Sequence, residues 1–214
     1  MDRTVSPDML TRLNVATRRW HLGADEPWLR LVDANVNWRT YLAHMMKMYG
    51  IEAPFESACA YTPQLANVIE AHQLTRAGFI AQDLLELGLM PSEVVKLPQC
   101  PISAFADVSE ALGWLYVMER STMLYARIRK HLLGRIPALA PTTSYLTAFE
   151  AVTTDGYWHR FGEALDRVAR TPQIASQIID AAHTAFQCTH RWFAAPGAPR
   201  RGVLRAASPA RFER

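Results

Sequence analysis

Two residues whose types and spacing suit metal chemistry are Asp155 and His159, which lie four positions apart. On a helix this spacing places both side chains on one face, one turn from each other. Together with Glu70, His72 and Glu119 they make up a candidate non-heme di-iron site, because such sites draw carboxylates and histidines from several helices. The alternative, which we favour, is that Asp155 serves the start of a helix.

His21 is a second candidate, near the end of the first predicted helix. A neutral imidazole binds iron through one ring nitrogen while its other N–H is held by a neighbouring acceptor. The spacing alone favours a simpler role, in which His21 ends an amphipathic helix and its cation interacts favourably with the helix dipole. Both roles stay open at the level of this single residue.

Cysteine usage and hydropathy exclude several classes of protein. Cys59, Cys100 and Cys188 are odd in number, lie far apart and make no CxxC pair, so neither a disulfide framework nor a zinc site is predicted, and a reducing compartment is expected. The N-terminal stretch has no apolar core behind its charges, and no apolar run approaches the roughly 20 residues of a membrane span. We therefore expect a cytoplasmic protein with no membrane association.

The charge pattern argues against a nucleic-acid partner. Half of the 214 residues are hydrophobic and 20% are charged, which is typical of a globular protein. The formal net charge is +3, but five arginines lie near the C-terminal end, namely Arg200, Arg201, Arg205, Arg211 and Arg214. Without them the rest of the chain is slightly acidic, and no basic stripe interleaved with aromatic residues is evident.

Apolar residues recur at helical spacing along most of the chain, and strand-like alternation is absent. The first predicted helix runs from Ser6-Pro7-Asp8 to about His21, the second begins after Asn35 or Asn37 and has a turn or kink at Pro54, and the third runs from Thr62-Pro63 to Gly88. The fourth is one long buried helix from Ala111 to Leu133. The fifth begins near Thr142 or Thr143 and bends around Gly156, and the last runs from Thr171-Pro172 to near Phe193.

The remaining signals concern one loop, one helix cap and the core. Three prolines within residues 89–106 predict a loop with a short turn, and Asp107 or Ser109 caps the helix that follows. Met45, Met46 and Met48 are interpreted as core filling. We therefore predict an all-α, single-domain helical bundle over residues 1–195 and a flexible basic tail over residues 196–214.

The stretch LNVATRRWHLGAD, residues 13–25, resembles the proximal helix of heme oxygenases. In that family an Ala-Thr pair, here ending at Thr17, lies one turn before the histidine that binds heme iron, and an acidic residue follows four positions later. The resemblance implies that His21 is the iron ligand and that Asp25 lies beside it. It also implies a heme oxygenase-like fold for the bundle.

Four further blocks extend the likeness over nearly the whole predicted domain. They are WRTYLAHMMKMYGIEAPFE at 38–56, TRAGFIAQDLLELG at 75–88, ALGWLYVMERSTMLYARIRKHL at 111–132 and FGEALDRVARTPQIASQIIDAAHTAF at 161–186. These blocks look like the bacterial heme oxygenases found beside bacteriophytochromes. The resemblance therefore implies a bacteriophytochrome as a partner of the protein.

The departure from the family lies in its distal helix, which in heme oxygenases reads approximately Tyr-Val-x-Glu-Gly-Ser-x-Leu-Gly-Gly. Here the segment starts at Tyr116, and Arg120, Leu124 and Tyr125 replace the three glycines. Glycine allows that helix to kink and its backbone to approach the heme, whereas these residues favour a straighter helix. Their volume would fill the space of porphyrin and dioxygen, and such overpacking costs about 1 to 3 kcal/mol.

The remaining site residues follow from the same resemblance. Ser121 matches the polar position that supports distal water and is the expected catalytic residue, although it is also an ordinary helix residue. Thr17, Tyr116 and Leu124 are expected at the heme. Arg120 is expected to reach a heme propionate or another anion, to pair with a neighbouring acid, or to plug the pocket. Arg160 matches a segment that supplies propionate partners, but we favour an exposed arginine.

Two functions from different classes follow. The first is an enzyme that binds heme through His21 and cleaves it to biliverdin, carbon monoxide and iron with an external electron donor, and whose product a bacteriophytochrome would accept. The second is a non-catalytic protein of the same fold that binds heme, another tetrapyrrole or a partner without turnover. The replaced distal glycines motivate the second.

Overall fold

The computed structural model describes residues 8–70, 74–150 and 156–195, and these form a helical bundle. Its helices are α1 (Met9–Leu29), α2 (Trp38–Ala60), α3 (Ala77–Glu86), α4 (Pro91–Val94), α5 (Val108–Arg120), α6 (Tyr125–Arg135), α7 (Ser144–Glu150), α8 (Tyr157–Val168) and α9 (Pro172–Ala194). No strand occurs in these described ranges, which confirms the predicted all-α class. The basic segment 196–214, predicted to be a flexible tail, lies outside them.

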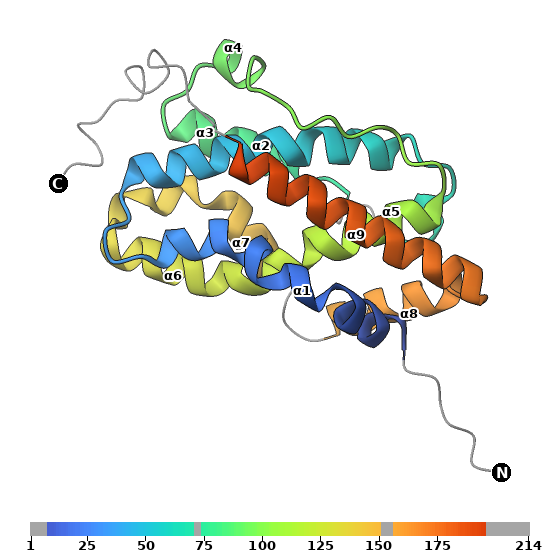
Figure 1. Ribbon diagram of the computed structural model, residues 1–214. Coiled ribbons are helices and arrows are strands. Elements are labelled where there is room, and N and C mark those ends of the chain that lie inside the picture. The colour runs from blue at the N-terminus through green and yellow to red at the C-terminus, as the bar shows by residue number, and fades with distance from the viewer. Residues whose placement is uncertain (1–7, 71–73, 151–155, 196–214) are drawn as a thin grey trace.

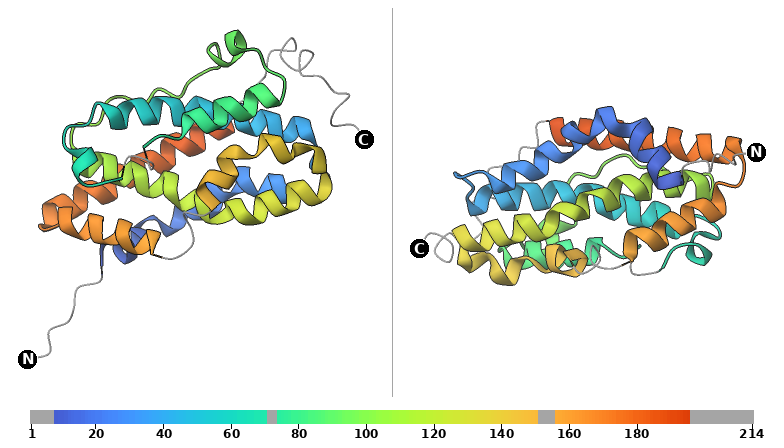
Figure 2. Two further views of the ribbon diagram at one scale, coloured as in Figure 1. Left: turned by 180° about the vertical axis from the view of Figure 1, so that it is seen from behind. Right: turned by 90° about the horizontal axis from the view of Figure 1, so that it is seen from below.

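Helix α9 lies at the centre of the packing that positions the site. It runs alongside α1 and packs closely on α5 (Figure 1, Figure 2). Gly113 permits this close approach, because a Cβ there would lie 2.4 Å from the Ile178 carbonyl oxygen of α9. The methionines predicted to fill the core, Met45, Met46 and Met48, are buried in α2.

Helix α1 is longer than predicted. Asp8 caps its start by accepting a hydrogen bond from the Thr11 backbone N–H at 2.7 Å, whereas the predicted start residues Ser6 and Pro7 lie outside the described ranges. The predicted end near His21 is wrong, because the helix continues to Leu29 with Pro27 inside it. Buried Trp28 packs this extension onto the core, so tertiary contacts outweigh the weak local propensity.

The predicted helix from Thr62 to Gly88 is also wrong. A left-handed turn at Gln64, with φ of 63°, interrupts it, and the helix proper is only α3, Ala77–Glu86. Residues 71–73 of the predicted helix are outside the described part of the chain. By contrast, Asn37 caps α2 as predicted, and α2 then runs through Pro54 to Ala60.

The predicted single helix from Ala111 to Leu133 is interrupted. Asp107 caps α5 as predicted, but α5 ends at Arg120, and a 3-10 segment, Ser121–Leu124, separates it from α6. The hydroxyl of Ser121 donates to the Met118 carbonyl at 2.8 Å, and that of Thr122 donates to the Glu119 carbonyl at 2.7 Å. Such side-chain bonds to the preceding turn bend helices, so the interruption persists without glycine.

The remaining elements agree more closely with expectation. The proline-rich stretch 89–106 contains only the short helix α4, and α9 begins after Thr171 and ends at Ala194. Helix α7 starts at Ser144, close to the predicted start, and α8 starts after Gly156, where a bend was predicted and where φ is 89°. Residues 151–155, which precede Gly156, lie outside the described ranges. None of the helices that can be described combines the length and apolarity needed to cross a membrane.

Candidate functional site

His21 lies half-buried on the side of α1 that faces α9, with its ring centroid 5.8 Å from that of Phe186. Its Nε2 lies 3.0 Å from the Thr17 hydroxyl, which itself donates to the Leu13 carbonyl at 2.7 Å. Because a hydroxyl has one proton, Thr17 accepts from the imidazole, and Nε2 therefore carries the proton. Burial lowers the pKa of His21, with Arg120 acting in the same direction and Asp25 opposing both, so the ring is neutral at pH 7.

Tyr116 lies beside this hydrogen-bonded pair, on α5. Its side chain is buried, with its ring centroid 6.4 Å from that of Phe186. Burial raises the pKa of Tyr116, and its interactions with Thr17 and Arg120 oppose that rise. Tyr116 therefore places α5 directly beside the Thr17–His21 pair of α1.

One turn after His21, Asp25 forms a two-point ion pair with Arg120. The two guanidinium nitrogens lie 2.5 and 2.9 Å from the two carboxylate oxygens, and only 14% of the Arg120 side chain and 22% of the Asp25 side chain are exposed. A planar guanidinium suits a carboxylate in this geometry. The pair joins the last residue of α5 to α1, so it spans the two helices that the resemblance places on either side of a heme.

The space between these two helices is small. A cavity of about 20 Å³ remains, and Asp25, Trp28, Met118, Arg120 and Ser121 are among the residues that line it. A water molecule needs roughly 10 to 15 Å³ on this measure. The cavity therefore has room for one water and for nothing much larger.

Ser121 connects this cavity to a chain of hydroxyl groups in the core. Its oxygen lies 3.1 Å from the Tyr125 hydroxyl, which lies 2.8 Å from that of Tyr145, and Tyr145 donates to Glu52 at 2.6 Å. Tyr125 and Tyr145 are fully buried. The position predicted to be catalytic is thus one end of a continuous polar path into the interior.

The other end of that path is a buried charge cluster around Arg76. The guanidinium lies 3.1 Å from a Glu52 oxygen and 2.7 Å from a Glu119 oxygen, and all three side chains are fully buried. Burial raises the pKa of Glu52, with Arg76 opposing, and a proton on this carboxyl would leave the cluster neutral. One oxygen of each glutamate has no hydrogen-bond partner.

Sequence reasoning missed Arg76 and its role. It lies in the block 75–88 that carried the resemblance, but nothing in its neighbourhood in the sequence marks it as buried. Glu119, considered above as a metal ligand, is instead an ion-pair partner of Arg76. Two carboxylates, one each in α2 and α5 and both facing a fully buried arginine, are a signal that appears only once the helices are packed.

Two predicted site residues lie apart from His21 or at its margin. Arg160 lies on α8, where its Nε is 3.6 Å from a Glu70 oxygen with both side chains more than half exposed. Leu124 ends the 3-10 segment and packs half-buried against the core. The structure thus brings Thr17, Asp25, Tyr116 and Arg120 together around His21, with Ser121 on the adjoining cavity.

Those residues of the di-iron alternative that the structure describes do not form a cluster. His159 contacts Glu163 at 3.4 Å in an exposed position, and Glu119 is held by Arg76. Asp155 and His72 fall outside the described residues. Within the ranges that are described, no three histidine, cysteine, aspartate or glutamate side chains are arranged to hold a metal ion.

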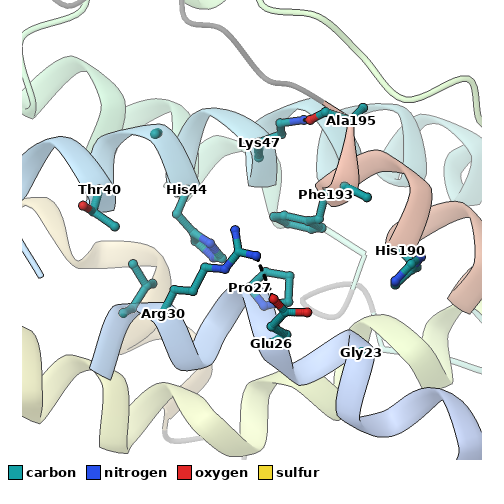
Figure 3. Close-up of a pocket in the computed structure, with 13 residues that line it drawn as sticks. Gly23, Glu26, Pro27, Arg30, Thr40, His44, Lys47, His190, Phe193 and Ala195 are labelled. Carbon is teal, nitrogen blue, oxygen red and sulfur yellow. Dashed lines mark hydrogen bonds and ion pairs between the residues drawn. The ribbon is translucent and has the colours of Figure 1, made fainter. Parts of the chain in front are cut away.

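A larger cleft lies on the side of α1 that faces α2 and the end of α9 (Figure 3). Its volume is about 430 Å³, within the range of about 300 to 1,000 Å³ that small-molecule sites occupy. Arg30, which pairs with Glu26, and Lys47, which donates to the Trp192 and Ala195 carbonyls, provide positive charge. Phe193 provides an apolar surface.

His44 lies at the margin of this cleft. The ring is nearly fully buried between Trp28 and Phe193, at centroid distances of 4.3 and 5.6 Å. Its Nε2 has no hydrogen-bond partner. Burial lowers the pKa of His44 to about 3, so this imidazole is neutral at physiological pH.

Comparison with known proteins adds one finding. A family model described as "Heme oxygenase" matches residues 7–195, which include every described helix. No curated protein and no solved structure matches the chain.

Proposed function

Because the chain belongs to the heme oxygenase family, we propose that it is a member whose heme cleft is closed and which does not turn heme over. The observation that carries this proposal is the ion pair between Arg120 and Asp25, which joins α5 to α1. Arg120 stands where the family places a distal glycine. Its side chain therefore occupies the position that catalysis requires to be empty.

Heme does not fit the arrangement of side chains at this site. The cavity of about 20 Å³ is more than tenfold smaller than the 300 Å³ at the low end of ligand sites. Both oxygens of Asp25 are engaged by Arg120. The neutral imidazole of His21, whose N–H is held by Thr17, suits iron, but the volume and the ion pair across the cleft do not.

The roles of biliverdin, an electron donor and a bacteriophytochrome all depend on the enzymatic alternative. A protein that does not cleave heme supplies no biliverdin, needs no external electron donor and offers nothing to a bacteriophytochrome. That alternative requires α1 and α5 to separate and Asp25 to exchange Arg120 for His21. The two-point ion pair opposes this movement, because it joins the last residue of α5 directly to α1.

A hemin titration followed by addition of ascorbate tests the proposal. The wild-type protein is expected to give no Soret band that depends on His21, as judged against His21→Ala. It is also expected to give no biliverdin spectrum after reduction. Arg120→Gly is expected to give a His21-dependent band, whereas Arg127→Gly, at an exposed position of α6 outside both sites, is the matched control and should not. A His21-dependent Soret band in the wild type that converts to biliverdin would overturn the proposal.

The larger cleft favours a second candidate function, binding of a tetrapyrrole without turnover. Arg30 and Lys47 present positive charge for propionate carboxylates, and Phe193 presents a ring for stacking. The test is a biliverdin titration monitored through tryptophan fluorescence, since Trp28 is adjacent to the cleft. Thr40→Trp, which fills the cleft, should abolish binding and His21→Ala should not; the reverse pattern would contradict it.

A further inference from the structure

Two cysteines that are distant in the sequence meet where the loop after α4 crosses α9. The sulfurs of Cys100 and Cys188 lie 3.2 Å apart, although 88 positions separate the residues, and both are free thiols. This distance is short enough for a hydrogen bond between the thiols. No covalent bond joins them in this structure.

The surrounding backbone holds both thiols in place. The Cys100 N–H donates to the Gly50 carbonyl of α2 at 2.7 Å, so the loop is tied to that helix. At Gly50 a Cβ would lie 2.4 Å from the Pro98 carbonyl oxygen and 2.5 Å from the Trp192 ring. The loop, α2 and α9 are therefore packed without space between them, and the encounter of the two sulfurs is built into the fold.

The two thiols differ in exposure and in acidity. Cys188 is half-buried, whereas Cys100 is buried. The hydrogen bond from Cys100 lowers the pKa of Cys188 to about 7, Arg191 acts in the same direction, and burial opposes both. The same bond, together with burial, raises the pKa of Cys100. A substantial fraction of Cys188 is therefore thiolate at pH 7, next to a protonated partner.

We propose that Cys188 and Cys100 form a dithiol site that reacts with hydroperoxides. The Cys188 thiolate attacks the peroxide, so that an S–O bond forms, the O–O bond breaks, and hydroxide leaves and takes up a proton as water. The Cys100 sulfur then attacks the sulfenic acid, the S–S bond forms, the S–O bond breaks, and the Cys100 proton leaves with the second water.

The step is balanced without any further reactant. Two thiols lose two electrons in total, and one hydrogen peroxide accepts them to give two water molecules. A dithiol reductant returns the disulfide to the two thiols and is itself oxidised to a disulfide. The proposal does not depend on heme or on the Arg120–Asp25 pair, so it stands or falls separately from the proposed function.

Cys59 provides an internal reference. It is the third cysteine of the chain and lies in the core of α2, with 2% of its surface exposed. Burial raises the pKa of Cys59 to about 12, so it carries almost no thiolate at pH 7. It is therefore expected to keep its thiol when the other two react.

The test uses the full chain with hydrogen peroxide at pH 7, followed by denaturation and a count of free thiols. Of its 3 cysteines, the wild type should retain one free thiol, and Cys59→Ser should retain none. Dithiothreitol should restore the thiols of Cys100 and Cys188 in both proteins. Digestion without reduction should yield a peptide pair linked through Cys100 and Cys188. Three thiols that persist after treatment, or linkage through Cys59 or between two chains, would overturn the proposal.

Two variants assign the roles. Cys100→Ser should leave a sulfenic acid on Cys188 that dimedone traps, because the resolving thiol is gone. Cys188→Ser should leave both remaining thiols unreacted over the same period. If instead Cys188→Ser reacts as fast as the wild type, Cys188 is not the attacking residue and the proposed order is refuted.

Discussion

The ion pair between Asp25 and Arg120 should contribute a measurable coupling free energy between α1 and α5. The perturbation is a double-mutant cycle with Asp25→Ala, Arg120→Ala and the double variant. Two charge-assisted hydrogen bonds, at 2.5 and 2.9 Å, connect side chains that are largely withdrawn from water. Alanine retains helix propensity at position 120, so the cycle isolates the pair rather than the backbone.

The expected magnitude lies between two known limits. Exposed ion pairs contribute about 0 to 1 kcal/mol, whereas hydrogen bonds to charged groups contribute about 1.5 to 3 kcal/mol. Because the exposed fractions are only 14% and 22%, we expect a coupling of about 1.5 to 3 kcal/mol. Part of each single-variant loss comes from leaving the other charge without its partner.

Urea denaturation at pH 7 measures this coupling, with equal m-values required across the four proteins. The exposed pair of Arg30 and Glu26, with side-chain exposures of 68% and 61%, lies at the end of α1; it is the control and should give about 0.3 to 0.5 kcal/mol. A coupling between Asp25 and Arg120 no larger than that of the control would refute the reasoning. It would show that the pair does not hold the cleft closed.

Three further predictions follow from other buried groups. The pKa of His44 is about 3 in the folded protein against about 6.5 when unfolded, so its contribution to stability is lost as pH falls below 6.5. Between pH 7 and 5 the free energy of unfolding should therefore fall about 2 kcal/mol more in the wild type than in His44→Leu. Equal pH dependence of the two proteins would contradict this. Arg76→Met should cost about 3 to 5 kcal/mol, measured by urea denaturation, because two buried carboxylates lose their counter-charge; a loss below 1 kcal/mol would mean that the cluster is hydrated. Oxidation of Cys100 and Cys188 should raise the free energy of unfolding by about 2 to 4 kcal/mol, since it closes a long loop, and Cys100→Ser should show no gain.

Local signals in the sequence were enough for the helix caps and for the family. Asn37 and Asp107, each one of two predicted candidates, and Thr171 cap their helices, because a capping side chain bonds to a backbone N–H two or three residues away and needs no tertiary context. Helix lengths were less accessible. Burial of Trp28 extends α1 past its glycine and proline, and the turn at Gln64 ends a pattern that looked helical.

The site divides in the same way. The cluster around His21 could be predicted because a family pattern joins Thr17, His21 and Asp25 within one helix. The pairing of Asp25 with Arg120 was one of several roles open to that arginine, and only packing of α1 on α5 selects it. The sulfur contact between Cys100 and Cys188 could not be predicted, since it depends on a loop that crosses two helices.

The interruption between α5 and α6 has a consequence for motion. A glycine kink is a hinge, since its backbone can adopt several conformations at little cost. Here the bend is fastened by the hydroxyls of Ser121 and Thr122, and fully buried Tyr125 anchors its far side. The 3-10 segment is therefore rigid and resists unfolding. Its amide protons should exchange with solvent as slowly as those of the helices it joins.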